Sequence, residues 1–325
     1  MEFKEILVTG GSGFIGSHLV RRLVKLGFNV TVTAKYKSII DCPRLVPVWD
    51  DINVVEADLR NIDSVLNINK ITKKYDLIYH LAAYNHVGDS FNHVHESLLS
   101  NLISTANLLE FGPRFGRFIY TASSEVYGFQ NSVPFRESDL PFPISPYAIG
   151  KYGGELYARM KKHQNVNKDI LCLRPFNTFG PHQSERAIIP EIIIKCLKGE
   201  TIKTTKGLQT REFNYIDNII DGFIIATNVS KIPDNPINIG SGKEILIKDL
   251  VKLIHKLTNS KSILNIGALE DRPTEIWRMK ADNTEAKLLL GWNENIPFEE
   301  GMIKTINWYK RFVKVYFGEN GLSKL

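Results

Sequence analysis

The sequence is poor in cysteine and has no long apolar run. Its 3 cysteines are Cys42, Cys172 and Cys196. They lie far apart, without the spacing of a metal site or a disulfide framework, so we expect reduced, structural thiols. The apolar stretch at residues 188–194 is interrupted by Pro190 and Glu191, and no membrane-spanning segment is predicted. The first residues carry no signal-peptide pattern, from which we expect a cytoplasmic protein.

Charge and composition also exclude several classes of protein. The chain is 43% hydrophobic and 23% charged, values typical of globular proteins rather than disordered or fibrous ones. Its net charge of +6 is spread along the chain, and the basic cluster at residues 161–163 is typical of a solvated helix end. We therefore expect no nucleic-acid partner and no membrane partner. A modest positive field suits a small polyanionic substrate.

Short apolar strands alternate with helical stretches through the first half of the 325 residues. The predicted strands are residues 6–9, 30–33, 53–57, 76–80, 117–121 and 170–174. Continuous apolar strands of this kind are typical of a parallel sheet covered on both faces. The pattern predicts an α/β fold with a doubly wound parallel sheet of the Rossmann type.

The pattern changes after residue 181. The predicted elements there are helices over 190–198, 215–228, 247–257 and 284–290, and a strand at 237–239 that returns to the sheet. We expect a dinucleotide-binding domain from residues 1–176 and 213–239. Residues 177–212 and 240–325 are expected to form a smaller, interleaved α/β substrate domain, with the substrate between the two.

A glycine-rich turn follows the first strand. Gly10 permits the tight turn, Gly13 lets the backbone approach a pyrophosphate, and Gly16 allows close helix–strand packing. Phe14 and Ile15 begin the helix whose N-terminus would face the phosphates. NAD-binding proteins usually place a carboxylate after the second strand, where this chain has Lys35. NAD or NADP is therefore the predicted cofactor, and Lys35 favours NADP.

Tyr147 and Lys151 are four residues apart in a predicted helix that Ser145 caps and Pro146 begins. This spacing places both side chains on one helix face. A lysine ammonium beside a phenol lowers the pKa of the phenol, so Tyr147 is predicted to act as a base during hydride transfer.

These motifs occur together with others in a fixed order. The further motifs are Asp58-Leu59, His80-Leu81-Ala82-Ala83, Ser123-Ser124-Glu125-Val126-Tyr127-Gly128 and Arg174-Pro175-Phe176-Asn177-Thr178-Phe179-Gly180-Pro181. In this order the chain resembles the extended short-chain dehydrogenases/reductases over nearly its whole length. The group within that family consists of nucleotide-sugar epimerases, 4,6-dehydratases and decarboxylases.

The resemblance implies a role for individual residues. Ser123 would bind the sugar O4, Tyr147 would be the base, and Lys151 would hold the ribose and the phenol. The implied cofactor contacts also include Asp58, Leu59, Leu81, Ala82 and Ala83. The implied substrate contacts are His86, Ser124, Asn177, Arg211 and Arg272, of which the two arginines would hold the diphosphate. The family's usual homodimer would use helices within residues 101–110 and 147–160. No metal site is expected, and His93 and His95 are interpreted as solvent-exposed.

The reaction depends on Glu125. A 4,6-dehydratase needs an acid/base group near C5 and C6 in addition to Tyr147, and the similar dehydratases carry a Glu at this position. We therefore predict an NAD(P)-dependent nucleotide-sugar 4,6-dehydratase. The alternatives are a 4-epimerase of the UDP-glucose/galactose type, a UDP-glucuronate decarboxylase and a non-catalytic nucleotide-sensing module.

Overall fold

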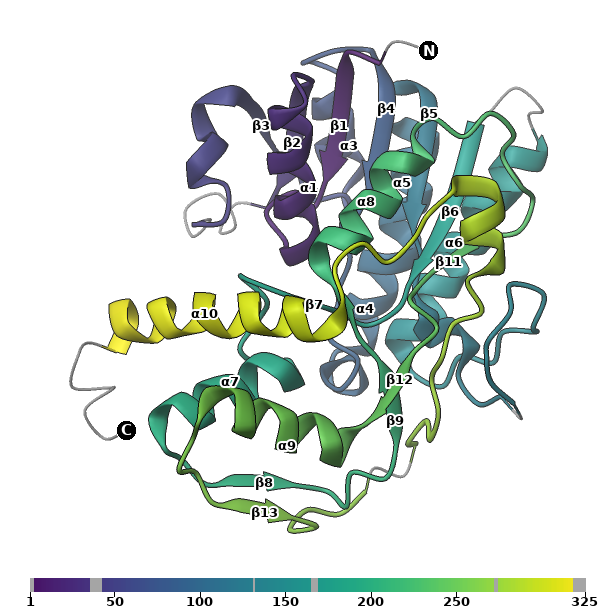
Figure 1. Cartoon of the computed structure of the whole chain (residues 1–325). Coiled ribbons are helices and arrows are strands. Elements are labelled where there is room, and N and C mark those ends of the chain that lie inside the picture. Colours follow the sequence, from purple (N-terminus) through teal and green to yellow (C-terminus); the bar gives the residue numbers. More distant parts are fainter. Residues whose placement is uncertain (1–2, 36–42, 131, 165–168, 272–273, 318–325) are drawn as a thin grey trace.

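The structure is a computed structural model that describes residues 3–35, 43–130, 132–164, 169–271 and 274–317. Its centre is a sheet of seven parallel strands in the order β11-β6-β5-β4-β1-β2-β3 (Figure 1). The strands are β1 (Glu5–Thr9), β2 (Asn29–Ala34), β3 (Ile52–Glu56), β4 (Lys74–His80), β5 (Arg114–Thr121), β6 (Asp169–Pro175) and β11 (Ile237–Ile239). The predicted doubly wound parallel sheet is confirmed, and every strand expected in it is present.

Both faces of this sheet are buried because successive side chains of each strand point to opposite sides. In β1, Ile6 and Val8 join one core cluster and Leu7 joins the other. The first cluster also contains residues of α1 (Phe14–Lys25) and α8 (Ile216–Ala226). The second contains residues of α3 (Ile62–Ile68), α5 (Ser104–Phe111) and α6 (Pro146–Gln164). This two-sided burial explains why the strands are apolar throughout.

A second lobe lies below the carboxyl edge of the sheet in Figure 1. It contains α7 (Ile188–Lys198), α9 (Ile247–Thr258) and two small sheets. Antiparallel β9 (Thr210–Glu212) and β12 (Glu244–Leu246) form one sheet, and parallel β8 (Ile202–Thr204) and β13 (Leu264–Ile266) form the other. A short parallel pair, β7 (Thr178–Phe179) and β10 (Asn214–Tyr215), lies at the start of this region. The predicted domain limits stay a prediction.

Several short helices lie in the connections between these elements. They are η1 (Val46–Asp51), η2 (Asp89–Phe91), α4 (Val94–Leu98), η3 (Leu99–Ile103), η4 (Ser124–Tyr127) and η5 (Ala286–Leu290). The segment predicted as a helix over 284–290 therefore contains a π-helical turn, η5. None of the helices in the described ranges is long and apolar enough to cross a bilayer.

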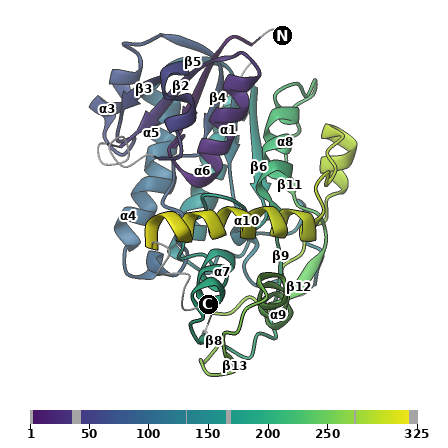
Figure 2. The same ribbon diagram turned by 60° about the vertical axis from the view of Figure 1, so that its left-hand side comes forward.

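The sequence prediction missed the last helix, α10 (Phe298–Phe317). Its buried residues Met302, Ile306, Tyr309 and Val313 are three or four positions apart, the spacing of an amphipathic helix, and this signal was available in the sequence. Figure 2 shows α10 between the sheet and the lower lobe. There the Tyr309 hydroxyl donates a hydrogen bond to the Gln183 carbonyl at 2.5 Å. The helix therefore supports the loop that follows β7.

A buried ion pair joins β6 to α6. Arg174 donates two hydrogen bonds to Glu155, at 2.9 and 2.7 Å, and both side chains are almost fully buried. The guanidinium also lies 4.7 Å from the centre of the Tyr127 ring. The pair thus connects the strand, the helix and the η4 turn.

Removing one member of this pair should destabilise the fold more than removing both. Arg174→Met leaves the Glu155 charge buried, and we expect a loss of about 3–5 kcal/mol in the free energy of unfolding. The double variant Glu155→Leu/Arg174→Met removes both charges and should lose less than Arg174→Met alone. Urea unfolding measures both values, and a double variant no more stable than Arg174→Met would contradict this account.

Candidate active site

The carboxyl ends of the parallel strands open into one cavity of about 490 Å³. Its walls come from the ends of β1, β2, β3, β4, β5 and β6, the loops after them and the start of α6. The lining includes Gly10, Gly13, Phe14, Ile15, Gly16, Lys35, Asp58, Leu59, Leu81, Ala82, Ala83, Ser123, Ser124, Glu125, Tyr147, Lys151 and Asn177. In open α/β sheets, ligands bind at this edge, where the strand order reverses. The structure therefore brings most of the predicted site residues together.

The glycine turn is shaped to leave backbone amides open to a phosphate. Gly10 has φ +68°, and a Cβ there would lie 2.7 Å from the backbone of Ala82. A Cβ on Gly16 would lie 2.3 Å from the Gly10 carbonyl oxygen. Helix α1 begins after Gly13 without a side-chain cap and has no acidic residue in its first turn. Its N-terminus therefore fits the pyrophosphate of NAD or NADP.

Basic and acidic side chains form a chain of ion pairs where the cavity meets the ends of β2 and β3. Arg60 donates hydrogen bonds to Asp58 and, at 3.1 Å, to Glu96. Lys35 lies 3.8 Å from Glu96. Arg60 holds the pKa of Asp58 below its usual range through their hydrogen bonds. Both cations line the cavity, so a phosphate there would meet Lys35 and Arg60.

His80 does not line the cavity but connects three of the elements around it. Its Nδ1 lies 2.7 Å from the Thr9 hydroxyl, and its Nε2 lies 3.0 Å from the Thr105 hydroxyl. The Thr9 hydroxyl also accepts a hydrogen bond from the Ala82 amide at 3.2 Å. Burial lowers the pKa of His80 to about 3, so the ring stays neutral. His80 therefore acts as a fixed connection between β1, β4 and α5.

The catalytic candidates meet at the ends of β5 and α6. Ser145 caps α6 by accepting a hydrogen bond from the Ala148 amide at 3.1 Å, which confirms the predicted helix start. Tyr147 then hydrogen-bonds to Ser123. The Ser123 hydroxyl also accepts from the Glu125 amide at 3.2 Å. The turn after β5 thus carries both Ser123, the hydrogen-bond partner of the Tyr147 phenol, and the Glu125 carboxylate.

Burial, rather than Lys151, dominates the ionisation of Tyr147. Desolvation raises the pKa of Tyr147 to about 12, opposed by the Ser123 hydrogen bond and reinforced by the nearby charge of Glu125. The Lys151 ammonium donates instead to the Thr121 carbonyl and lies 4.8 Å from the centre of the Tyr120 ring. The expected lowering of the Tyr147 pKa is therefore wrong for the protein alone. Burial also lowers the pKa of Lys151 to about 7.

The predicted substrate residues divide into two groups. Ser124 and Asn177 line the cavity, whereas His86 and Arg211 do not. His86 accepts a hydrogen bond from the Asp89 amide at 3.2 Å. Arg211 is engaged by Glu275 at 2.5 Å and by the Ile276 carbonyl. Arg272 lies outside the described residues. The diphosphate role of the two arginines stays a prediction.

Several cavity residues were not among the predicted contacts, and Arg60 and Gln183 are two of them. Arg60 stands two positions after Asp58, and its charge beside an expected adenosine contact was the available signal. The side-chain amide of Gln183 donates to the Thr178 backbone carbonyl at 2.8 Å, and the backbone carbonyl of Gln183 accepts from the Tyr309 hydroxyl of α10. Because α10 was not predicted, nothing in the sequence placed Gln183 at the site. His93 and His95 are exposed, as expected.

The fold, the glycine turn and the Tyr147/Lys151 helix define an extended short-chain dehydrogenase/reductase, the class expected from the motifs. The family model described as GDP-mannose 4,6 dehydratase matches residues 7–305, and the chain belongs to this family. Its relatives are nucleotide-sugar dehydratases, epimerases and decarboxylases, and this chain is an enzyme of the same kind.

Three similar proteins represent three reactions. UDP-glucuronic acid decarboxylase 1 from Xenopus tropicalis is 33% identical, over 95% of this chain and 72% of the relative. The dTDP-D-glucose 4,6-dehydratase of Bos taurus is 31% identical, over 94% of this chain and 89% of the relative. The structure of UDP-glucuronic acid 4-epimerase from Bacillus cereus, in complex with UDP-glucuronic acid and NAD, has a TM-score of 0.85 and 28% identity. It covers 94% of this chain and 99% of that one.

The burial of Lys151 should give the protein a specific pH dependence. Its pKa is about 7 in the folded chain against 10.5 ordinarily, so between these values the unfolded chain binds more protons. The free energy of unfolding should therefore rise with pH across this window, through this group. Lys151→Met should remove that part of the rise. Urea unfolding from about pH 6 to about pH 10 measures the slope, and equal slopes for both proteins would contradict the assignment.

Proposed function

We propose that this enzyme is an NAD(P)-dependent nucleotide-sugar 4,6-dehydratase. The observation that carries the proposal is the position of Glu125. Its carboxylate lies in the same cavity as Ser123 and Tyr147, close enough for its charge to raise the pKa of the phenol. Dehydration requires a second acid/base group near C5 and C6, whereas oxidation and reduction at C4 alone do not.

In this proposal the side chains divide the proton transfers. Bound NAD(P) would supply the hydride acceptor for C4 and the hydride donor for C6. Tyr147, hydrogen-bonded to Ser123, accepts the proton of the C4 hydroxyl as that carbon is oxidised. The C4 ketone acidifies the C5 proton, which Glu125 removes. Glu125 then gives this proton to the departing C6 hydroxyl, so that water leaves. As hydride reaches C6, C5 takes a proton from solvent through Glu125, and the proton held by Tyr147 is returned to solvent.

Two alternatives use the same first step. A 4-epimerase returns the hydride to the other face of C4, and a decarboxylase loses carbon dioxide from the 4-keto sugar acid. Neither needs a base for the C5 proton. Both remain alternatives because the chain is similar to the Bacillus cereus epimerase and to the Xenopus tropicalis decarboxylase. The Bos taurus dehydratase and the placement of Glu125 favour dehydration.

The cofactor proposed is NAD or NADP, with a preference for NADP. The Bacillus cereus relative binds NAD. In this chain the residue directly after β2 is Lys35, and both Lys35 and Arg60 line the expected adenosine end of the cavity. These two side chains would bind the 2′-phosphate of NADP, and this contact would replace their present ion pairs with Asp58 and Glu96.

The substrate proposed is a nucleoside-diphosphate sugar. Asn177 and Ser124 would contact the sugar end, while Arg211 and Arg272 would hold the diphosphate. Arg211 would then share its guanidinium between Glu275 and a phosphate, since a guanidinium has five N–H donors. We propose that the reaction takes place in the cytoplasm.

A homodimer is proposed through the helices η3, α5 and α6. Ile149, Leu156 and Met160 are 50%, 45% and 39% exposed, and they lie along one side of α6. Ile103 of η3 is 38% exposed. Large exposed apolar side chains gathered on adjacent helices are typical of a protein interface. Because η3 runs directly into α5, each copy offers two helical segments, and a second copy would complete a four-helix contact.

The Glu125→Gln variant tests the role of the carboxylate. It should still reduce the bound cofactor when the nucleotide sugar is added, because Tyr147 and Ser123 remain. Release of the 4-keto-6-deoxy product should fall at least about 100-fold, since the C5 base is lost. Tyr147→Phe should instead prevent cofactor reduction. Absorbance of reduced nicotinamide and product analysis by mass spectrometry separate the two steps.

Other products from the wild-type enzyme would overturn the proposal. A C4 epimer without loss of water would assign an epimerase, and a pentose with carbon dioxide would assign a decarboxylase. Tight cofactor binding without turnover of any nucleotide sugar would assign a non-catalytic nucleotide-sensing module.

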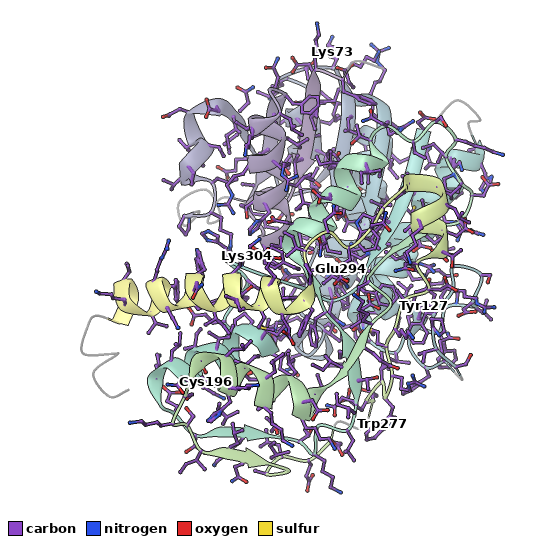
Figure 3. The ribbon with its side chains drawn as sticks, viewed as in Figure 1. Lys73, Tyr127, Cys196, Trp277, Glu294 and Lys304 are labelled. Carbon is purple, nitrogen blue, oxygen red and sulfur yellow. The ribbon has the colours of Figure 1, made fainter. Side chains whose placement is uncertain are left out.

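Lys35→Glu tests the NADP preference. It places a carboxylate where NAD-binding proteins usually have one, so affinity for NADP should fall about tenfold or more relative to affinity for NAD. Lys73→Glu makes the same charge reversal on an exposed residue at the far end of the upper lobe and should leave the ratio unchanged (Figure 3). Calorimetric titration with each dinucleotide gives the ratio, and a parallel change in both affinities would reject the assignment.

A further inference from the structure

Met279 lies directly behind two side chains of the proposed substrate site. Its sulfur is 3.6 Å from the Ser124 hydroxyl oxygen and 3.4 Å from Asn177 Nδ2, and both groups are oriented as donors to it. Met279 is fully buried, in the cluster that includes Tyr127 and Phe176. Three segments distant in the sequence therefore meet at one sulfur atom.

The backbone around Met279 is fixed on both sides. Before it, the Trp277 carbonyl accepts a hydrogen bond from the Thr210 amide at 2.8 Å. After it, the Lys280 carbonyl accepts from the Phe135 amide at 2.7 Å. Figure 3 shows Trp277 in the lower lobe and Tyr127 in the upper one, and in Figure 1 the chain after β13 rises along the side of the molecule from the lower lobe to the upper. The sulfur is thus held at a defined place between the two lobes.

The contacts of Asn177 define the orientation of its amide. Nδ2 donates to the Glu212 carbonyl at 3.2 Å and to the Met279 sulfur, so both of its hydrogens are directed at protein groups. The amide oxygen consequently faces away from Met279. In this orientation Asn177 offers the cavity a hydrogen-bond acceptor, which suits a sugar hydroxyl.

A thioether is a weak acceptor, and this property matters at the site. It aligns the hydroxyl of Ser124 and the amide of Asn177 without binding them strongly. A ligand oxygen that approaches Ser124 can therefore replace the sulfur at little cost. An apolar side chain of the same size would fill the space but would align neither donor.

We propose that Met279 is a positioning residue that orients Asn177 and Ser124 for the sugar of the substrate. The inference rests on the proposed function only in that the site must hold a nucleotide sugar. It is independent of whether dehydration, epimerisation or decarboxylation follows.

The test compares Met279→Leu with Met302→Leu. Both replace a fully buried methionine by leucine, but Met302 lies in α10, in a different core cluster. On the NAD-loaded enzyme, Met279→Leu should raise KM and the dissociation constant of the nucleotide sugar about five- to tenfold. Its kcat should change less than about twofold, because the same contacts serve the ground state and the transition state. Met302→Leu should change neither constant.

A double-mutant cycle separates positioning from packing. In an Asn177→Ala background, Met279→Leu should lose most of its effect on affinity, because the amide that it orients is gone. Equal effects of Met279→Leu with and without Asn177, or equal effects of the two Leu variants, would overturn the proposal.

A spectroscopic arm does not depend on turnover. The chain has 4 methionines, so the methyl signals of a protein labelled at methionine can be assigned with single Leu variants. Addition of a nucleotide sugar should shift the Met279 methyl signal and leave that of Met302 in place. If the wild-type protein binds no nucleotide sugar, the proposed function fails. The inference about the sugar fails with it. If the wild-type protein does bind one, a crystal structure of Met279→Leu tests the orientation directly: a rotated Asn177 amide supports the inference, and an unchanged one rejects it.

Discussion

All seven strands of the large sheet run in the same direction, so the loops that leave their carboxyl ends emerge at one edge. The whole site depends on this constraint. The glycine turn after β1, the acidic and basic residues after β3, and the Ser123–Glu125 turn after β5 are separated by many residues in the chain. They line one cavity because their strands are neighbours in the sheet. The second lobe then closes this edge with segments such as the one that carries Met279.

Burial determines the chemistry of the catalytic corner. It raises the pKa of Tyr147 and lowers that of Lys151, so desolvation favours the neutral form of both groups. The hydrogen bond from Ser123 acts in the opposite direction on the phenol. A proton-transfer role for Tyr147 therefore requires groups that stabilise phenolate at the moment of reaction. Ser123 is already in position for this, while Lys151 is held by the Thr121 carbonyl and would have to share its donors.

Local patterns in the sequence were sufficient for the central sheet and for much of the cavity. The strands, the glycine turn and the Ser145 cap obey short-range rules of burial, backbone freedom and hydrogen bonding, and the structure has them where they were expected. Helix α10 was missed although the spacing of its apolar residues was visible. The pKa of Tyr147 was misjudged because the expectation used the spacing to Lys151 and left out the burial of the phenol, and because the ammonium is directed at the Thr121 carbonyl. Arg60 was overlooked beside a residue that was expected to contact the cofactor.

The sequence by itself determined the class of fold and the glycine turn, because each depends on residues close together in the chain, and its family motifs supplied the candidates for the catalytic side chains. Only the tertiary structure decided what those side chains contact. It pairs Arg211 with Glu275, directs Lys151 to a carbonyl, and places the sulfur of Met279 against Ser124 and Asn177. These contacts join positions tens to more than a hundred residues apart. They follow from how segments distant in the chain pack together, which no local pattern encodes.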